Sequence, residues 1–574
     1  MKAILICGSL LVAALPLCHP LAAQQSSVPV AGVIPTIEDL MNVEVTSVSS
    51  REQRISDVGA AVFVLTAEDI RRSGAVNIPD LLRLVPGVDV AQLDAHTWAI
   101  SIRGFNDIYA NKILVVIDGR SVYSPLTSGV NWDQQDVPVE DIERIEVIRG
   151  PAGTIWGANA VNGVISIITK KADKGEGGLV RAGASSRGSA DGLTQYGGAL
   201  GTSGAYRLFA AYQNTVSLPA GSSASADSDW HSMHGGGRVD LAVTPRDSLT
   251  LEGDLQRMEG SSTPQFGGPY LTTLAEADAI AHWDHTLLNG SEMSLETYFD
   301  HYNRSVQGAS ELRNTFDIDF RHHLTTGLRH NIVWGLGYRI TADQTTPGGA
   351  IAYIPADKAD NLFSLFIQDE IRLNNVVSLT LGSKLEHNPY TGFEYEPGAQ
   401  LVWHPTVKQQ VWISIARAIR QPARADTGIQ VTEYSYPLTS GGTASVEELG
   451  TPNQPSERFL TYEAGYRNEL TRKLSLDATV FFSSIHNLIS LFPGQPFAVG
   501  GNPDDIVIPS YFRDDSFART YGAELYGTWA VSSRLNSTSA TPRHISRLTR
   551  LHWRGHRAAR MQPLRGYRSR PEAS

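Results

Sequence analysis

The stretch with the clearest chemical signature runs from residue 139 to 169 and reads VEDIERIEVIRGPAGTIWGANAVNGVISIIT. Its glycines provide the backbone freedom that a phosphate-binding loop needs. A Walker loop also requires GxxxxGK[ST], with lysine on the phosphates and Ser or Thr on magnesium. Here Gly157 is followed by Ala158 and Asn159, and the dinucleotide pattern GxGxxG is absent as well. The stretch therefore does not predict nucleotide binding.

Catalytic and metal-binding patterns are also missing from the sequence. The 16 histidines are scattered. The adjacent His322 and His323 lie in an alternating strand pattern, in which neighbours point to opposite faces. No HExxH, GxSxG or EF-hand pattern occurs. The two cysteines, Cys7 and Cys18, lie near the start, so we expect no disulfide or thiolate metal site in the body of the protein. We predict no catalytic residue, no metal site, no cofactor and no enzyme activity.

Residues 1–23 have the features of a secretory signal peptide. A short basic start precedes an apolar run, and small residues precede Gln24. A transmembrane anchor needs about 20 apolar residues, but Pro16 and His19 interrupt this run. A lipoprotein signal is the alternative because of Cys18, although Leu17 before it is larger than the usual small residue.

From residue 178 the sequence predicts many antiparallel strands that span a membrane. Short polar turns recur about every 40 residues for most intervals. Between them, apolar and polar residues alternate, with Phe363, Leu365 and Ile367 opposing Ser364, Gln368 and Glu370. Such alternation suits strands with one face in lipid and one in a polar lumen. A soluble sandwich would also alternate, but it would not place short turns at one end and long polar loops at the other. Those long loops are Thr215–Asp229, Gly260–Ala275, Thr341–Ala359, Gln421–Ser456 and Phe492–Asp514.

Composition agrees with a large β-rich protein. Glycine occurs 52 times, charged residues make up 19%, and the net charge is −11. A nucleic-acid binder would show a basic patch instead. Aromatic residues near predicted strand ends are typical of the belts at membrane interfaces, and we assign this role to Trp230, Tyr298, Trp334, Trp403 and Trp529.

The stretch 139–169 resembles the end of the plug domain of TonB-dependent outer-membrane receptors. The family hallmark, IE-x-IEV-x-RGP-x-x-x-x-[YW]G-x-x-A-x-x-G, is matched by Ile142-Glu143, Ile145-Glu146-Val147, Arg149-Gly150-Pro151, Trp156-Gly157, Ala160 and Gly163. Two further plug motifs precede it in the expected order, Ile102-Arg103-Gly104-Phe105 and Val116-Ile117-Asp118-Gly119-Arg120.

This resemblance implies a transmembrane β-barrel with an α/β plug domain at its N-terminal end. The plugged transporters of this class close with 22 strands, and about sixteen are recognisable up to Trp529. The expected organisation is a signal peptide (1–23), a periplasmic segment (24–57), the plug (58–172), a partial barrel (178–533) and a basic tail (534–574).

The plug region reads as a small α/β unit. Ala61–Leu65 is a predicted strand, and Thr66 begins a capping box for a helix that ends at Gly74. Asn77 is placed to cap a second helix. Further strands are predicted at Ile100–Ile102, Ile113–Ile117 and Val164–Thr169.

The basic tail differs from the rest of the chain. Alternation stops after Ser533, and residues 534–574 contain ten arginines, no lysine and one acid, Glu572. We interpret the tail as foreign to the barrel, the result of truncation or a frameshift, with about six strands missing relative to the family. A genuine basic extension is the alternative. An open sheet edge in lipid is disfavoured because unsatisfied amides are costly there.

The resemblance also implies site residues. A segment ahead of the plug, the coupling segment Glu44, Val45, Thr46, Ser47 and Val48, is the candidate TonB box, which pairs as an added strand with the inner-membrane energy transducer. The alternative is that it is simply the first strand of the plug. Arg103 and Arg149, with the adjacent Gly104 and Gly150, are candidates to bridge plug and barrel. Barrel acids such as Glu370 or Glu463 are possible partners, since a lone buried charge is costly.

Two groups of plug residues have alternative roles. Glu143 and Glu146 either contact the barrel or pair with Arg144 or Arg149 inside the plug. Trp98, Tyr123 and Trp132 are candidates to face the ligand, and for the two tryptophans simple packing is the alternative.

The resulting functional hypothesis is a receptor in the bacterial outer membrane that imports a large scarce nutrient, with a ferric siderophore preferred. Cobalamin or another metal chelate is the alternative within the class. A binding surface without transport, or a defective fragment, is the alternative outside it. The expected partners are a TonB-type transducer of the inner membrane, the iron-chelate ligand and outer-membrane lipid, with no nucleic acid.

Overall fold

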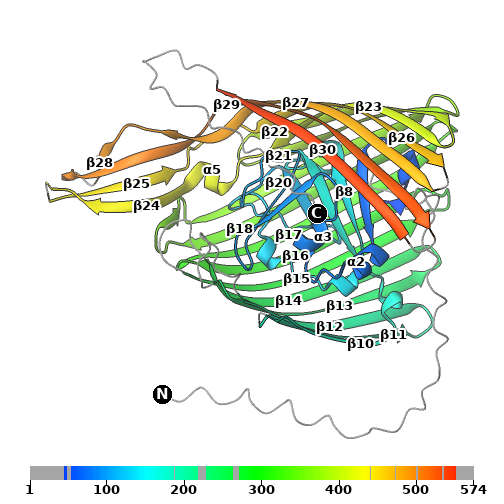
Figure 1. Cartoon of the computed structure of the whole chain (residues 1–574), viewed down its shortest axis with the longest axis horizontal. Helices are drawn as coiled ribbons and strands as arrows, with labels where there is room; N and C mark the ends of the chain where they lie inside the picture. Colours follow the sequence, from blue (N-terminus) through cyan, green and yellow to red (C-terminus); the bar gives the residue numbers. More distant parts are fainter. Residues whose placement is uncertain are drawn as a thin grey trace, which may run out of the picture.

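The computed structural model contains two nested parts, a small mixed sheet and a large antiparallel sheet that curves around it (Figure 1). It describes residues 44–47, 53–186, 188–216, 228–262, 270–439, 441–471, 473–499, 502–532 and 535–550. The predicted signal peptide and Val48 lie outside the described residues.

The inner part is the predicted plug, and its five-stranded sheet confirms the expected α/β unit. The strand order is β3 (Ala61–Thr66), β8 (Ile142–Arg149), β9 (Gly163–Thr169), β6 (Ile113–Ile117) and β7 (Arg120–Ser121). Strands β6 and β9 are parallel, and the other neighbours are antiparallel. A separate hairpin joins β4 (Val88–Gln92) to β5 (Trp98–Ile102).

Local sequence signals explain the plug helices. Thr66 caps α2 (Ala67–Ser73) in a capping box with Asp69, and Gly74 ends the helix at φ 71°. Asn77 caps α3 (Ile78–Leu82) by accepting a hydrogen bond from the Asp80 N–H. Such caps satisfy amide groups that a helix end leaves without partners. The remaining short elements of the plug are α4 (Gly153–Trp156), β1 (Glu44–Val45), β2 (Gln53–Arg54) and the 3-10 turns Ile55–Asp57, Trp132–Gln134, Val139–Asp141 and Ala172–Gly175.

The outer part is a 21-stranded sheet. Its wall strands are β10 (Gly177–Ala184), β11 (Ala190–Leu200), β12 (Gly204–Thr215), β13 (Trp230–Thr244), β14 (Asp247–Ser262), β15 (Tyr270–Thr286), β16 (Glu292–Val306), β17 (Ala309–Thr326), β18 (His330–Thr346), β20 (Asp357–Arg372), β21 (Val377–Asn388), β22 (Gly392–Thr406), β23 (Gln409–Arg420), β26 (Glu457–Thr471), β27 (Leu474–Pro493), β29 (Asn502–Ser532) and β30 (Leu535–Arg550). Within the described residues, no pairing joins β10 to β30.

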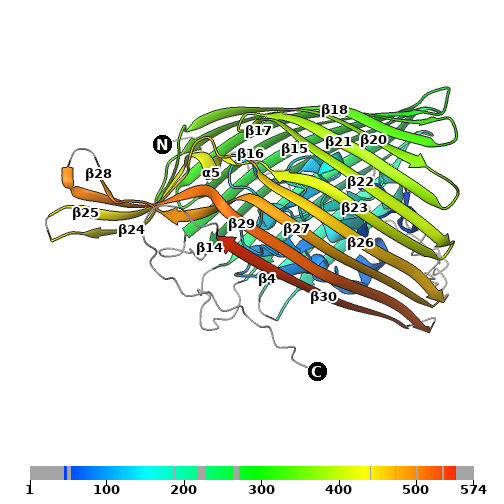
Figure 2. The ribbon, with the colours of Figure 1, turned by 90° about the horizontal axis from the view of Figure 1, so that it is seen from above.

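A sheet that projects from the wall, which we call the arm, is built from the long connections. It comprises β19 (Ile351–Tyr353), β24 (Ile429–Pro437), β25 (Thr443–Leu449), β28 (Phe497–Val499) and the first part of β29. Figure 2 shows the arm extending away from the barrel at the end where these connections lie. The short helix α5 (Arg424–Gly428) lies at its root.

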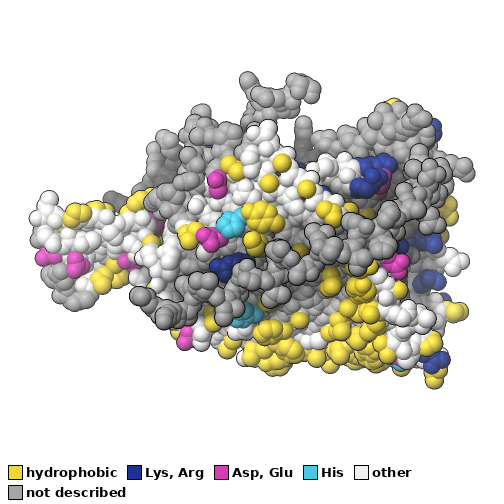
Figure 3. All heavy atoms as spheres, turned by 90° about the horizontal axis from the view of Figure 1, so that it is seen from below, with side chains coloured by type: hydrophobic (Ala, Val, Ile, Leu, Met, Phe, Trp, Pro, Cys, Tyr) yellow, Lys and Arg dark blue, Asp and Glu magenta, His cyan; other side chains and the backbone are white. Residues whose placement is uncertain are grey.

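The predicted alternation is confirmed along the wall. Phe363, Leu365 and Ile367 of β20 are exposed on the outside, and Phe366 between them is buried. Apolar side chains gather over part of the outer surface (Figure 3), as a lipid-facing wall requires. No helix among the described residues is long and apolar enough to cross a membrane.

The predicted aromatic belt is wrong for two of its five members. Trp403 and Trp529 are exposed on the outside, but Trp230 and Tyr298 are almost completely buried. The Trp230 indole N–H donates to the Ala95 carbonyl of the plug, and Tyr298 lines a cavity beside the plug. The cause is the phase of the strand, because shifting the alternation by one residue exchanges the lipid and lumen faces.

The predicted tail also requires a correction. Leu535–Arg550 lies in residues 534–574 but forms β30, which pairs antiparallel with β29. Pairing of this kind uses main-chain groups and does not require alternating apolar side chains, which is why the sequence pattern did not reveal it. Residues 551–574 lie outside the described residues.

Candidate functional site

The plug is joined to the wall by a buried ionic bridge centred on Arg103. The Arg103 backbone adopts a positive φ of 56°. Its guanidinium contacts Glu463 of β26 and Glu524 of β29, each at 2.8 Å. The Phe481 ring centroid lies 4.1 Å from its central carbon. The guanidinium is nearly fully buried, and two carboxylates supply the charge compensation that a buried arginine needs.

Arg149 shares this bridge. Its Nη1 lies 3.1 Å from Glu524 Oε2 and donates to the Pro86 carbonyl. Gly150, which follows it, has a φ of 125°. A Cβ at Gly150 would lie 2.9 Å from Arg103 Nη1 and 3.0 Å from Glu463 Oε2. Glycine therefore leaves room for the contact between Arg103 and Glu463 beside Arg149.

Three further plug-to-wall contacts were not anticipated from the sequence. Lys112 contacts Glu457 at 2.5 Å, and Glu457 also pairs with Arg420. Arg120 of β7 contacts three acids on β15 and β16, namely Glu276, Asp278 and Asp300. The Arg467 guanidinium of β26 donates to the carbonyls of Ile55, Val58 and Ala60. The plug is thus tied to the wall by charges on several sides.

The coupling segment lies against the plug through Glu146 of β8. The Glu146 carboxylate is fully buried. It accepts from the Thr46 N–H at 3.0 Å, the Ser47 N–H at 2.9 Å and the Ser47 hydroxyl at 2.6 Å. Arg144 donates to its other oxygen at 2.7 Å. One carboxylate therefore holds two consecutive main-chain donors of the segment.

Two more contacts hold the coupling segment against the plug. The Trp156 indole N–H donates to the Ser47 carbonyl at 2.7 Å. Val45 is fully buried in a cluster that includes Val62, Leu114 and Ile148. β1 pairs antiparallel with β2, with Val45 opposite Gln53. We call these contacts of Glu146, Trp156 and Val45 the dock.

The other predicted plug residues are placed as follows. Glu143 is half-buried in β8 and forms no ion pair with the residues that the structure describes. Trp98 and Trp132 lie in the main hydrophobic core of the plug, which is the packing role that the sequence left open. Glu370, a possible partner of the arginines, instead accepts from the Gln53 side chain. Gly104 adopts a φ of 97° beside Arg103.

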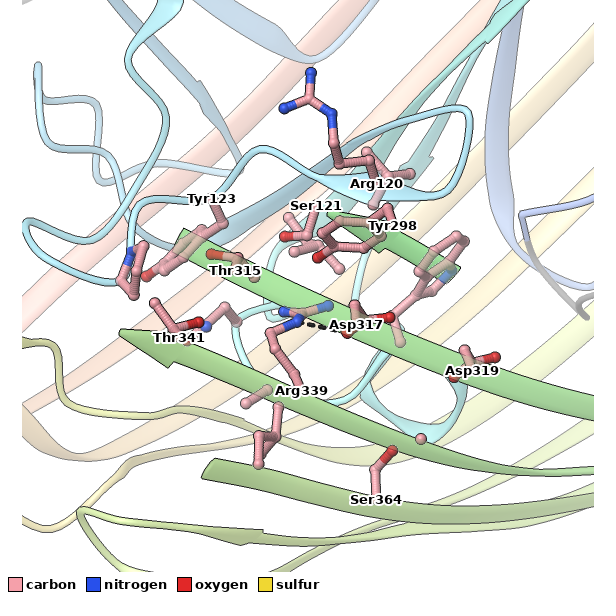
Figure 4. Close-up of a pocket in the computed structure, with 18 of the residues that line it drawn as sticks. Arg120, Ser121, Tyr123, Tyr298, Thr315, Asp317, Asp319, Arg339, Thr341 and Ser364 are labelled. Atoms are coloured by element: carbon pink, nitrogen blue, oxygen red, sulfur yellow. Dashed lines mark hydrogen bonds and ion pairs between the residues drawn. The ribbon is translucent and has the colours of Figure 1, made fainter. Parts of the chain in front are cut away.

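Tyr123 lines a polar cavity of about 170 Å³ between plug and wall. Figure 4 shows Arg120, Ser121 and Tyr123 of the plug opposite Tyr298, Thr315, Asp317, Asp319, Arg339, Thr341 and Ser364 of the wall. Arg339 donates to Asp317 at 2.7 Å across this surface. The plug and wall are therefore separated here by a space with polar walls. Among the described residues, no cluster of His, Cys, Asp and Glu has the geometry to hold a metal ion.

Comparison with known protein families identifies the family of this chain. The family model for the TonB-dependent receptor plug domain matches residues 54–164. The model for the TonB-dependent receptor-like β-barrel matches residues 179–565. The chain belongs to the TonB-dependent receptor family. It is therefore a receptor of the outer membrane and a member of a non-enzymatic family.

Curated relatives show how far the receptor's similarity extends. The chain is 36% identical over 137 residues to the vitamin B12 transporter of Vibrio vulnificus, a match that covers 24% of this chain and 22% of that protein. It is 25% identical over 513 residues to an iron-regulated outer membrane virulence protein of Vibrio cholerae, covering 84% of this chain and 74% of the relative.

Solved structures share the receptor's fold. A ferric enterobactin receptor of Pseudomonas aeruginosa superposes with a TM-score of 0.70 at 18% identity, covering 85% of this chain and 81% of that one. The alcaligin outer-membrane receptor of Bordetella pertussis superposes with a TM-score of 0.64 at 17% identity, covering 88% and 83%. At these identities the likeness establishes the fold alone.

Proposed function

We propose that this receptor imports a metal chelate, preferentially a ferric siderophore, in a process energised by a TonB-type transducer. The observation that carries the proposal is the dock, in which one buried carboxylate holds Thr46 and Ser47, the residues that follow a short strand ahead of the plug. This is the position in which the family places the segment that the transducer grips.

The chemistry of the dock supports a releasable coupling segment. A partner that adds a strand needs free main-chain donors and acceptors on the strand it joins. In the docked state Glu146 occupies the N–H groups of Thr46 and Ser47, and Trp156 occupies the Ser47 carbonyl. Pairing with a transducer therefore requires that these contacts break first. The dock holds the segment out of reach until then.

The plug–wall bridges support the need for external work. The lumen is filled by a folded domain whose buried ions are compensated by acids of the wall. Moving the plug separates buried opposite charges, which costs about 3–5 kcal/mol when one partner of such a pair is lost. Thermal motion does not supply several such losses together, so a pull on the coupling segment is the expected trigger.

Relatives support a metal chelate as the ligand class. One curated relative is a vitamin B12 transporter, another is regulated by iron, and a structural neighbour is a ferric enterobactin receptor. The broader coverage of the iron-regulated relative favours a ferric siderophore over cobalamin, which is the second candidate.

Uptake assays test the proposal directly. Cells that produce the full chain are given radioactive ferric siderophores or cobalamin, with the transducer present or deleted. We expect accumulation of one ligand that requires the transducer, whereas surface binding does not. Removal of residues 44–48 should likewise abolish accumulation of the ligand and leave surface binding unchanged. Transducer-independent uptake, or binding without uptake of any ligand in intact cells, would overturn active transport and favour a passive binding surface.

A further inference from the structure

The outer end of the receptor has an unusual charge balance. In this class of barrels the longer connections face the exterior. Two of them, residues 421–456 and 493–515, contain eight acidic residues, two arginines and no lysine. The acids are Asp426, Glu433, Glu447, Glu448, Asp504, Asp505, Asp514 and Asp515. These two connections therefore carry an excess of negative charge.

Both arginines of these connections already have acidic partners. Arg424 of α5 is buried against Asp343 of β18 and also donates to the Pro355 carbonyl. Arg513 pairs with Asp515 at 2.8 Å on the surface. Each positive charge is thus neutralised within the protein, so neither is available to bind a second anion without leaving a carboxylate behind.

At the outward-facing end of the plug, positive charge is likewise neutralised within the protein. The loop after Arg103 exposes Asp107 and Tyr109, the latter with 51% of its surface accessible. Tyr109 lies within electrostatic reach of Arg304 and Glu448. Arg304 forms a bidentate contact with Asp133, in which its two terminal nitrogens donate to the two carboxylate oxygens at 3.2 and 2.8 Å. The arginine within electrostatic reach of this exposed ring is therefore already engaged.

Two carboxyl groups face each other at the root of the arm. Glu433 of β24 and Glu448 of β25 share a side-chain hydrogen bond, and burial together with the neighbouring Glu433 raises the pKa of Glu448 to about 7. Figure 3 shows acidic side chains on the described face of the arm and no lysine or arginine there. Positive charge placed near this pair would be stabilised, and negative charge would be repelled.

We propose that the ligand of this receptor is a metal chelate without net negative charge, either neutral or cationic. The inference rests on the proposed function and narrows its ligand class. Specific recognition of a polyanion uses charge-assisted donors such as arginine and lysine, and like charges across an interface select against a wrong partner. Here the cations around Tyr109 are engaged and the surplus is acidic. An exposed tyrosine provides an apolar and cation-attracting contact instead.

Binding of three ferric chelates of different charge tests this inference. The probes are a linear trihydroxamate chelate of charge +1, a neutral cyclic trihydroxamate chelate and a tricatecholate chelate of charge −3. Each is titrated against outer membranes that contain the full chain. We expect the cationic or neutral chelate to bind at least on the order of tenfold more tightly than the trianion. Added salt should weaken the cationic chelate because it screens exposed charges.

Two double variants sharpen the test. Glu433→Gln with Glu448→Gln removes the charge of the carboxyl pair, in which Glu448 lies within electrostatic reach of Tyr109. Asp504→Asn with Asp505→Asn instead removes acidic charge next to the β24–β25 turn, where Asp505 accepts from the Thr443 N–H. We expect the first to weaken the cationic chelate several-fold and the second to change it less than twofold. Equal or tighter binding of the trianion by the unmodified receptor would overturn the inference and leave the proposed function standing. If none of the three chelates nor cobalamin binds, both are overturned.

Discussion

The bridge and the dock are both contacts of one plug strand, β8, but they differ in how they are built. At the bridge, Arg149 and the nearby Arg103 meet two wall acids, and all four groups are buried charges. At the dock, Glu146 accepts mainly from neutral N–H and O–H donors of Thr46 and Ser47, which follow the two-residue strand β1. Breaking the bridge separates charges in a low dielectric, whereas undocking exchanges hydrogen bonds with water.

Because of this difference, the plug can stay bound to the wall while the coupling segment is released from it. Losing one partner of a buried ion pair costs about 3–5 kcal/mol, whereas a hydrogen bond to a charged group contributes about 1.5–3 kcal/mol. The coupling segment should therefore separate from the plug long before the plug separates from the wall. Four substitutions test this difference in strength between the bridge and the dock.

The largest effect is expected for Glu524→Gln. This change leaves Arg103 with one carboxylate and Arg149 with none of the acids it contacts in the described residues. We expect the plug to lose about 3–5 kcal/mol of stability, measured from the urea dependence of plug proteolysis in the purified receptor. Glu394→Gln is the matched control, because Glu394 pairs with Arg417 in a less buried contact on the same wall and should cost at most about 1 kcal/mol. Equal losses of stability in the two variants would show that the bridge contributes no more to the stability of the plug than the less buried Glu394–Arg417 pair does.

Glu146→Gln should act on the dock and leave the bridge intact. An amide keeps the volume of the carboxylate but replaces one acceptor oxygen by a donor that faces the N–H groups of Thr46 and Ser47. We expect a docking loss of about 1.5–3 kcal/mol, seen as faster maleimide labelling of Thr46→Cys. Glu143→Gln, on the same strand, should leave the labelling rate unchanged. If both variants label alike, Glu146 does not hold the segment.

Gly150→Ala tests how closely the bridge is fitted. Its φ of 125° is unfavourable for any residue with a Cβ, and that Cβ would lie 2.9 Å from Arg103 Nη1. Such strain costs about 1–3 kcal/mol. We expect reduced resistance of the plug to protease, with no change in labelling of Thr46→Cys. Gly74→Ala serves as a control, since its φ is also positive but a Cβ there meets no atom, and it should be milder.

The smallest effect is expected for Trp156→Phe. The ring is retained, but the hydrogen bond to the Ser47 carbonyl is lost. A single neutral hydrogen bond contributes about 0.5–1.5 kcal/mol, so labelling of Thr46→Cys should accelerate modestly, by less than in Glu146→Gln. A larger effect than that of Glu146→Gln would reverse the ranking of the two contacts.

The sequence singled out plug residues more readily than their partners. The plug motifs pointed to Arg103, Arg149 and Glu146 because short-range patterns and turn glycines mark them. For Glu146 the sequence offered a contact with the barrel or a pair with Arg144 or Arg149, and its contact with the coupling segment was not anticipated. The wall acids were harder to choose, because many lumen-facing positions carry acids and their position around the barrel depends on pairing between distant strands. Glu463 was among the candidates, Glu370 proved to contact Gln53, and Glu524 was not anticipated.

The phase of the alternation along each strand explains why the aromatic residues differ from their predicted positions. Alternation assigned Phe363, Leu365 and Ile367 correctly to the outside because several residues in a row share the pattern. Single aromatic residues give no such phase, so Trp230 and Tyr298 were assigned to a membrane belt although they face the plug and the lumen. The β30 strand was missed because main-chain pairing leaves no apolar signature in its sequence.

A disulfide across the coupling hairpin tests whether the coupling segment must be released for transport. Val45 and Gln53 are opposite each other in the antiparallel β1–β2 pair, where Cα atoms lie about 4.5–5.5 Å apart, a distance that a disulfide spans. In Val45→Cys with Gln53→Cys, we expect the oxidised receptor to bind its ligand normally but not to import it, and reduction should restore uptake. Import at the unmodified rate by the fully oxidised receptor would contradict the account, because the coupling segment would then work without being released.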